Sequence, residues 1–171
     1  MKAIALVGPS QSGKSTLAFS FSKFLEKKGL KVGVASMGGS SKPIKYEAFW
    51  DARSRKDQKG DWFKKARVEG FDFVILDFTA PFDDFFFSKE NSAPLEKADA
   101  VLLVFEVGSA PHEDAEALAK ALEERLEKKV IPVENKCDLA KKGKFTFPSK
   151  VVSVSAWEKI GFEKLFSALK T

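Results

Sequence analysis

Residues 8–16 read Gly8-Pro9-Ser10-Gln11-Ser12-Gly13-Lys14-Ser15-Thr16. They fit the P-loop pattern G-x-x-x-x-G-K-[S/T], in which glycines let the backbone wrap around phosphate groups and successive N–H groups point inward. The pattern predicts that Lys14 reaches the β- and γ-phosphates of a nucleotide and that the Ser15 hydroxyl binds Mg²⁺. The candidate nucleotide ligands are Gly8, Ser10, Gln11, Ser12, Gly13, Lys14, Ser15 and Thr16.

The residues on either side of this loop match the strand and the helix that a P-loop joins. Residues 2–7 form an apolar run typical of a buried strand. After the loop, apolar residues recur at helical spacing, and a helix start at this point adds the positive end of its dipole to the phosphate site. The helical set is Leu17, Phe21, Phe24 and Leu25. The context therefore favours a nucleotide site over a chance match.

Strand-like and helix-like segments alternate along the rest of the chain. Six segments are predicted as strands: residues 2–7, 30–35, 71–77, 98–107, 130–135 and 150–154. Helices are predicted after the P-loop, at 46–53, around 62–66, from a capping Ser109 to about 128, and at 162–169. This order predicts an α/β fold, a three-layer domain with a mostly parallel six-stranded sheet. With 171 residues, the chain is expected to form a single domain, residues 1–171.

The composition of the sequence indicates the environment in which the protein works. No basic and apolar leader opens the sequence, and no apolar run approaches the ~18 to 20 residues of a membrane span, which predicts a soluble, cytoplasmic protein. The single cysteine, Cys137, excludes an internal disulfide, and the lack of Cys/His clusters argues against a zinc site. A charged fraction of 31%, with few Asn and Gln residues, is typical of a thermophile.

The net charge of +5 is concentrated in residues 42–67, where nine basic residues and four acidic ones account for the whole excess. Five aromatic residues are interleaved with these charges: Tyr46, Phe49, Trp50, Trp62 and Phe63. This pattern fits a surface for nucleic acid or an acidic protein, and it also fits amphipathic helices that bury their aromatics. Residues 82–87 hold four phenylalanines, which indicates a second aromatic surface for a partner or a homodimer, or packing against 42–67.

Polar residues follow the predicted strands at the edge where parallel sheets bind ligands. Asp77 ends the third strand, where a Walker B carboxylate holds Mg²⁺ directly or through water, opposite Ser15. The plainer interpretation is a solvated aspartate at a strand end. The motif predicts Lys14, Ser15 and Asp77 as the catalytic group, with Ser15 and Asp77 as the metal ligands.

Asn135-Lys136-Cys137-Asp138 ends the fifth predicted strand and resembles the N-K-x-D guanine-recognition motif of P-loop GTPases. The Asp138 carboxylate can accept hydrogen bonds from both N1–H and the N2 amine of guanine, a donor pair that adenine lacks. The resemblance implies that Asn135 contacts the purine and tethers the loops, and that the stem of Lys136 covers the ring. Cys137 takes the variable position, so it is expected to be a packed side chain rather than a nucleophile.

The sixth predicted strand ends in Ser155-Ala156-Trp157, which resembles the family's S-A-K segment. The resemblance implies that the Ala156 N–H meets guanine O6; Trp157 replaces the lysine. It also implies GTP and GDP with Mg²⁺ as ligands, and a slow GTPase acting as a nucleotide-controlled switch or adaptor. His112, the only histidine, is expected to be a capping or exposed residue rather than a catalytic one.

The sequence also departs from the Ras-like pattern. The family's D-x-x-G appears as Asp77-Phe78-Thr79-Ala80 followed by Pro81, so Ala80 still offers an N–H to the γ-phosphate but with restricted geometry. No threonine lies between Leu17 and Leu76, and no glutamine follows Ala80. A parallel strand is predicted directly after the P-loop helix. In this arrangement the chain is similar to the class of nickel-insertion and molybdopterin-guanine-dinucleotide B-type GTPases.

Two other functions stay open. A P-loop kinase would transfer the γ-phosphate to a small acceptor held by Arg53, Arg55 and Lys56. Kinases of this kind use an arginine-bearing lid, however, and Arg125 is the only arginine after Arg67. A non-hydrolysing scaffold would keep the nucleotide pocket without turnover.

Overall fold

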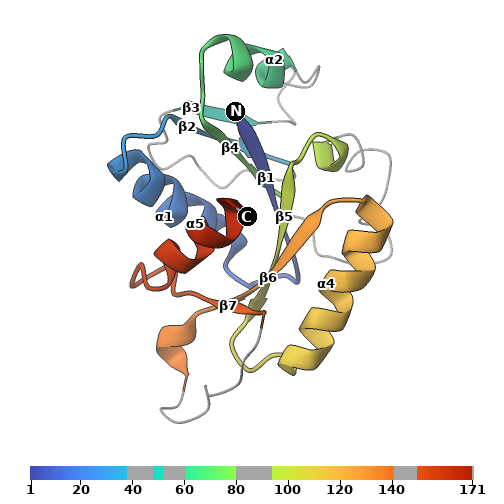
Figure 1. Ribbon diagram of the computed structural model, residues 1–171. Coiled ribbons are helices and arrows are strands. Elements are labelled where there is room, and N and C mark those ends of the chain that lie inside the picture. The colour runs from blue at the N-terminus through green and yellow to red at the C-terminus, as the bar shows by residue number, and fades with distance from the viewer. Residues whose placement is uncertain (38–47, 52–60, 80–93, 141–149, 171) are drawn as a thin grey trace.

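A computed structural model describes residues 1–37, 48–51, 61–79, 94–140 and 150–170. Within them lies one sheet in which all paired strands run parallel, in the order β3-β2-β4-β1-β5-β6-β7 (Figure 1). The strands are β1 Lys2–Val7, β2 Val32–Ser36, β3 Ala48–Asp51, β4 Phe73–Asp77, β5 Ala100–Glu106, β6 Lys129–Asn135 and β7 Val152–Ser153. The predicted α/β class and parallel sheet are confirmed, and so is the parallel strand after the first helix.

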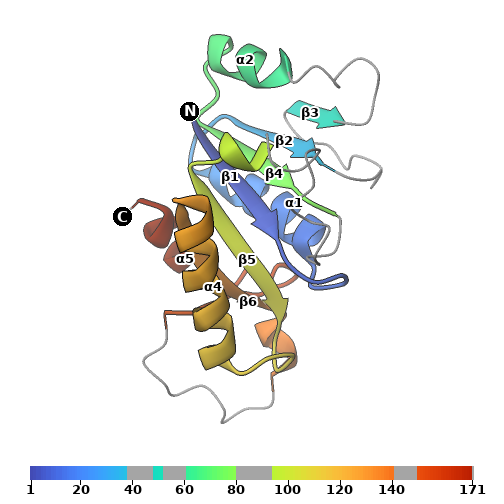
Figure 2. The same ribbon diagram turned by 90° about the vertical axis from the view of Figure 1, so that its right-hand side faces the viewer.

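Helices cover both faces of this sheet (Figures 1 and 2). The helices α1 (Lys14–Lys27) and α5 (Phe162–Lys170) pack on one face. The helices α2 (Asp61–Val68) and α4 (His112–Leu126) pack on the other. A short 3₁₀ helix, η1 (Cys137–Leu139), follows β6. Among the described residues, no helix combines the length and the apolar character needed to cross a membrane.

The central strand β1 shows how the sequence builds this arrangement. Its side chains alternate between the two faces, so Ile4 and Leu6 join the core under α1 and α5, while Val7 joins the core on the opposite side. All three are essentially inaccessible to solvent. A strand with both faces covered is apolar along its whole length, which is why residues 2–7 could be recognised in the sequence.

The described residues form a sheet of seven strands, so the prediction of six was wrong. The added strand is β3, in a region predicted as a helix from the spacing of its aromatics. Phe49 pairs with Val34 of β2 and faces the α1/α5 side, whereas Trp50 faces the other side. This alternation is that of a strand. Trp50 fits because its indole lies over Gly33, where a Cβ atom would be 2.2 Å from the ring.

The helix predicted from a capping Ser109 to residue 128 is shorter than expected. The N-cap of α4 is Pro111, and the Ser109 hydroxyl instead donates to the Glu106 carbonyl at 2.6 Å. Proline disfavours helical geometry in the residue before it, so Ala110 cannot belong to the helix. Ser109 therefore shapes the turn after β5 rather than capping α4.

Candidate functional site

The P-loop joins β1 to α1 at the carboxyl edge of the sheet, and two of its glycines are required by close packing. Gly8 has φ 147°, and a Cβ there would lie 1.9 Å from the Val104 carbonyl oxygen of β5. Gly13 has φ 83°, and a Cβ there would lie 2.5 Å from Asn135 Nδ2. The loop is thus packed closely against β5 and β6.

Lys14 is the first residue of α1 and is almost completely buried, with 5% of its surface exposed. Its ammonium donates to the carbonyls of Gly8 at 2.8 Å and Pro9 at 2.7 Å. Burial lowers the pKa of Lys14, and the nearby Asp77 charge partly opposes this effect. The Ser12 hydroxyl is buried without a hydrogen-bond partner. A phosphate group would supply a partner for the Ser12 hydroxyl and a charged acceptor for the Lys14 ammonium.

Asp77 ends β4 and is buried beside Lys14 and Ser15. Burial raises the pKa of Asp77, while a hydrogen bond from Ser15 and the positive charge of Lys14 act in the opposite direction. The Oδ1 atom of this carboxylate is buried with no hydrogen-bond partner. An unsatisfied carboxylate oxygen next to a hydroxyl is a donor set that fits Mg²⁺.

Ser15 and Asp77 are therefore the residues that would hold Mg²⁺, which when bound would neutralise charge on the phosphate oxygens. Among the described residues, no group of three or more His, Cys, Asp or Glu side chains is arranged to hold a metal.

Replacing Asp77 with asparagine should stabilise the protein without nucleotide at neutral pH. Because burial raises the pKa of Asp77, its contribution to stability is complete below the unfolded value, about 3.9, and is lost as pH rises through the folded value. A neutral amide avoids that loss, and a gain of about 1 kcal/mol would raise Tm by ~2–4 °C. Thermal unfolding from pH 3 to pH 8 measures the effect.

The matched control is Glu124→Gln, which removes one negative charge from the exposed face of α4. It should leave Tm unchanged. The Asp77→Asn advantage should disappear toward pH 3, and the same variant should lose Mg²⁺-dependent nucleotide affinity. A lower Tm for Asp77→Asn than for the parent at pH 7 would show that the ionised carboxylate stabilises the fold.

Asn135 ends β6 and connects three loops. Its Nδ2 donates to the Ser12 carbonyl at 3.0 Å and lies 3.5 Å from that of Gly13. Its Oδ1 accepts the Ala156 N–H at 3.1 Å. Asn135 is 1% exposed, so these bonds are shielded from water. The P-loop, the Asn-Lys-Cys-Asp loop and the Ser-Ala loop therefore meet at one place.

The Ala156 N–H is engaged with Asn135 rather than free, so a guanine O6 would have to share or displace that bond. Ser155 is fully buried and shapes the same loop, since its hydroxyl accepts the Glu158 N–H at 3.0 Å. Its backbone pairs with Ile160 in an antiparallel bridge. Trp157, at the tip of this loop, is 79% exposed.

The other residues of the Asn-Lys-Cys-Asp loop lie at the carboxyl end of β6. Asp138 is exposed in η1, and Lys136 has a left-handed backbone, φ 64°, just before η1. Burial raises the pKa of the Cys137 thiol, and the charges of Asp138 and Glu134 raise it further. A thiol whose ionisation is suppressed is a poor nucleophile. The Cys137 side chain itself is only partly buried.

Several predicted residues lie outside the described residues, among them Ala80, most of 42–67 and all of 82–87. The basic residues of the kinase interpretation, Arg53, Arg55 and Lys56, lie outside as well. In the P-loop itself, Ser10, Gln11 and Thr16 are exposed, and Gln11 has φ 62°.

Sequence reasoning missed two polar residues near these strand ends. Ser36 ends β2, is buried, and is in register with Asp77. Glu134 is a buried carboxylate of β6 that accepts hydrogen bonds from His112 Nε2 at 3.1 Å and Ser153 Oγ at 3.3 Å. His112 is thus paired, and it is neither a cap nor a free surface residue. The signal for Ser36 and Glu134 was a polar residue at the end of an apolar run.

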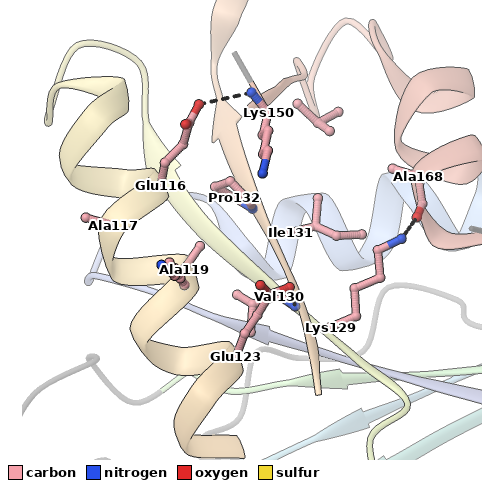
Figure 3. A pocket seen from close by; sticks show the side chains of 12 residues that line it. Glu116, Ala117, Ala119, Glu123, Lys129, Val130, Ile131, Pro132, Lys150 and Ala168 are labelled. Atoms are coloured by element: carbon pink, nitrogen blue, oxygen red, sulfur yellow. Dashed lines mark hydrogen bonds between the residues drawn. The ribbon is translucent and has the colours of Figure 1, made fainter. Parts of the chain in front are cut away.

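A hollow of about 540 Å³ lies elsewhere, between α4, β6 and α5 (Figure 3). None of the predicted nucleotide ligands lines it. The Glu123 carboxylate accepts the Val130 N–H at 3.0 Å, and Pro132 has no N–H to offer. These two positions face away from β5, so this stretch of the β6 edge presents no free donors to another strand.

No protein-family model and no curated protein matches the sequence. Solved structures do match, and three of them are similar at 16% to 19% identity. PAB0955, a GTPase in apo form from Pyrococcus abyssi, superimposes with a TM-score of 0.77 at 19% identity, over 99% of this chain and 96% of that one. An LAO/AO transport system kinase superimposes with a TM-score of 0.67 at 19% identity, over 99% of this chain and 58% of that one.

The MinC:MinD cell division protein complex from Aquifex aeolicus matches with a TM-score of 0.56 at 16% identity, over 79% of this chain and 68% of that one. Such low identities establish the architecture rather than the activity. The chain therefore has the fold of the P-loop NTPases, and a known GTPase is among the proteins that share it.

Proposed function

We propose that this protein binds GTP and GDP with Mg²⁺ and hydrolyses GTP slowly, as a nucleotide-controlled switch or adaptor. The observation that carries the proposal is the bonding of Asn135, which joins the phosphate loop to the two loops expected at the base. The guanine-recognition motif is too short to carry the proposal by itself. Its attachment to the P-loop supports a role for Asp138 at the same edge as the proposed phosphate site.

The phosphate half of the site divides the work among three residues. The Lys14 ammonium would leave the carbonyls of Gly8 and Pro9 for the β- and γ-phosphates, a charge-assisted contact that is stronger than the neutral acceptors. Ser15 and Asp77 would hold Mg²⁺. Neutralisation of the negative charge on the γ-phosphate oxygens is the main contribution that such a site makes to phosphoryl transfer.

Hydrolysis by the isolated protein should be slow. No glutamine follows Ala80 to orient the attacking water, and none of the sequence motifs includes an arginine that would neutralise charge in the transition state. Unassisted GTPases of this kind turn over at about 10⁻⁴ s⁻¹, and the rate here should lie within a few orders of that value. Single-turnover phosphate release from GTP measures it. A rate above about 1 s⁻¹ without a partner would mean that a catalytic group exists beyond Lys14, Ser15 and Asp77.

A kinase is the second candidate, favoured by the structural similarity to the LAO/AO transport system kinase. The same assay separates the candidates when phosphate release is followed with and without small hydroxyl, carboxylate and amine acceptors. Free phosphate as the only product supports the GTPase. Phosphate appearing on an acceptor supports the kinase, and tight GTP binding with no turnover in either setting supports the non-hydrolysing scaffold.

The switch would act through residues 42–67 and 82–87, which follow β2 and β4 in the sequence. We expect a protein partner or a second copy of the chain to bind that surface. The basic charge of residues 42–67 would also attract nucleic acid. A nucleotide changes such a surface only by binding one of its arrangements better than another.

A further inference from the structure

Glu106 is the last residue of β5 and stands in register with Asn135 of β6. No motif in the sequence includes it. Two residues earlier in the same strand, the Val104 carbonyl packs against Gly8 of the P-loop. Glu106 therefore stands at the strand ends between the phosphate loop and the Asn-Lys-Cys-Asp loop.

The Glu106 carboxylate reaches Lys136 across the ends of two neighbouring strands. Its Oε2 atom lies 2.9 Å from Lys136 Nζ, and the two side chains are 43% and 32% exposed. The stem of Lys136 passes beside the P-loop, because its Cε atom would be 3.9 Å from a Cβ at Gly13. Lys136 is thus fixed at both ends, by its left-handed backbone and by the ion pair of its ammonium.

Glu106 is itself held firmly. Its carbonyl accepts the Ser109 hydroxyl at 2.6 Å and the Ser109 N–H at 3.0 Å. The next residue, Val107, donates its N–H to the Asn135 carbonyl at 2.9 Å. The turn after β5 is therefore tied both to itself and to β6, so the carboxylate is presented from a fixed backbone.

We propose that Glu106 is a positioning residue for nucleotide binding, which holds the Lys136 stem in the place where it covers the purine ring. This inference rests on the proposed function. A flexible lysine loses side-chain entropy when it packs on a base, and an ion pair formed beforehand reduces that loss. The Lys136 side chain is then already aligned when the nucleotide binds.

Simple electrostatics predicts the opposite effect, which makes the inference testable. A carboxylate near a bound polyphosphate repels it, so removing the Glu106 charge alone would strengthen binding. Positioning predicts weaker binding instead, and only for ligands that have a base. Pyrophosphate occupies the phosphate loop without a base, so it separates the two effects.

The experiment measures the affinities of GDP and of pyrophosphate, each with Mg²⁺, by displacement of a fluorescent GDP analogue from the full chain. Glu106→Ala should weaken GDP about fivefold, near the upper limit for an exposed ion pair, and leave pyrophosphate unchanged or slightly tighter. In a Lys136→Ala background, Glu106→Ala should change neither affinity. Glu124→Ala, the same charge change on α4 toward the opposite edge of the sheet, is the control and should have no effect.

Glu106→Asp should recover part of the GDP affinity, because it keeps the charge on a shorter stem. Unchanged or tighter GDP binding by Glu106→Ala would overturn the inference, and so would an equal loss for pyrophosphate or a full loss in the Lys136→Ala background. These results differ from failure of the proposed function, in which the parent protein itself would bind GDP no better than pyrophosphate.

Discussion

Replacing Lys14 with alanine should lower the affinity for GTP by about 10² to 10⁴. Each hydrogen bond to a charged group contributes about 1.5–3 kcal/mol, and Lys14 already makes two bonds to carbonyls that phosphate oxygens would replace. The loss should be measured by calorimetric titration of GTP with Mg²⁺. Burial lowers the pKa of Lys14 and the Asp77 charge partly opposes this effect, so the buried ammonium disfavours the fold without nucleotide.

Lys27→Ala is the matched control, because Lys27 lies on the same helix in its last, exposed turn. It removes the same charge and should leave GTP affinity unchanged. If Lys14→Ala bound GTP within threefold of the parent, the P-loop would not be the phosphate site of this protein.

Replacing Asp138 with asparagine should exchange guanine for xanthine specificity. The carboxylate can accept from N1–H and the N2 amine of guanine, whereas an asparagine amide can donate to the carbonyl that xanthine carries at that position. A site built for paired donors rejects a ligand that leaves its polar groups unpaired by up to about 10⁴ to 10⁵. We expect GTP affinity to fall toward that limit and xanthosine triphosphate affinity to rise.

Asp114→Asn provides the control, because Asp114 is an exposed aspartate in the first turn of α4. It should leave both affinities as they are. If the Asp138→Asn variant still preferred GTP to xanthosine triphosphate, the proposal that Asp138 recognises the base would be contradicted.

The parts of the site that could be predicted are those encoded locally. The P-loop lies within nine consecutive residues between an apolar run and a helical pattern, so both its position and its flanking elements followed from the sequence. The same holds for Asp77 and Asn135, each a polar residue directly after an apolar strand. Once the strands were assigned, the rules for parallel sheets put these residues at one edge.

The parts that could not be predicted depend on residues far apart in the sequence. Aromatic residues at 46, 49 and 50 fit a helical period as well as a strand, and the contact of Trp50 with Gly33 settles the choice. Asn135 and Ser12 are separated by 123 positions, and Glu106 and Lys136 by 30. The start of α4 is different, since Pro111 already excluded Ser109 as its cap.

The central claim is that the carboxyl edge of this sheet recognises guanine. Its most direct test is competition between GTP and ATP for the parent protein, measured with Mg²⁺ by displacement of a fluorescent GDP analogue. The account predicts that GTP displaces the analogue at concentrations at least a hundredfold lower than ATP, because adenine offers Asp138 no donor pair. Equal displacement by GTP and ATP would contradict it.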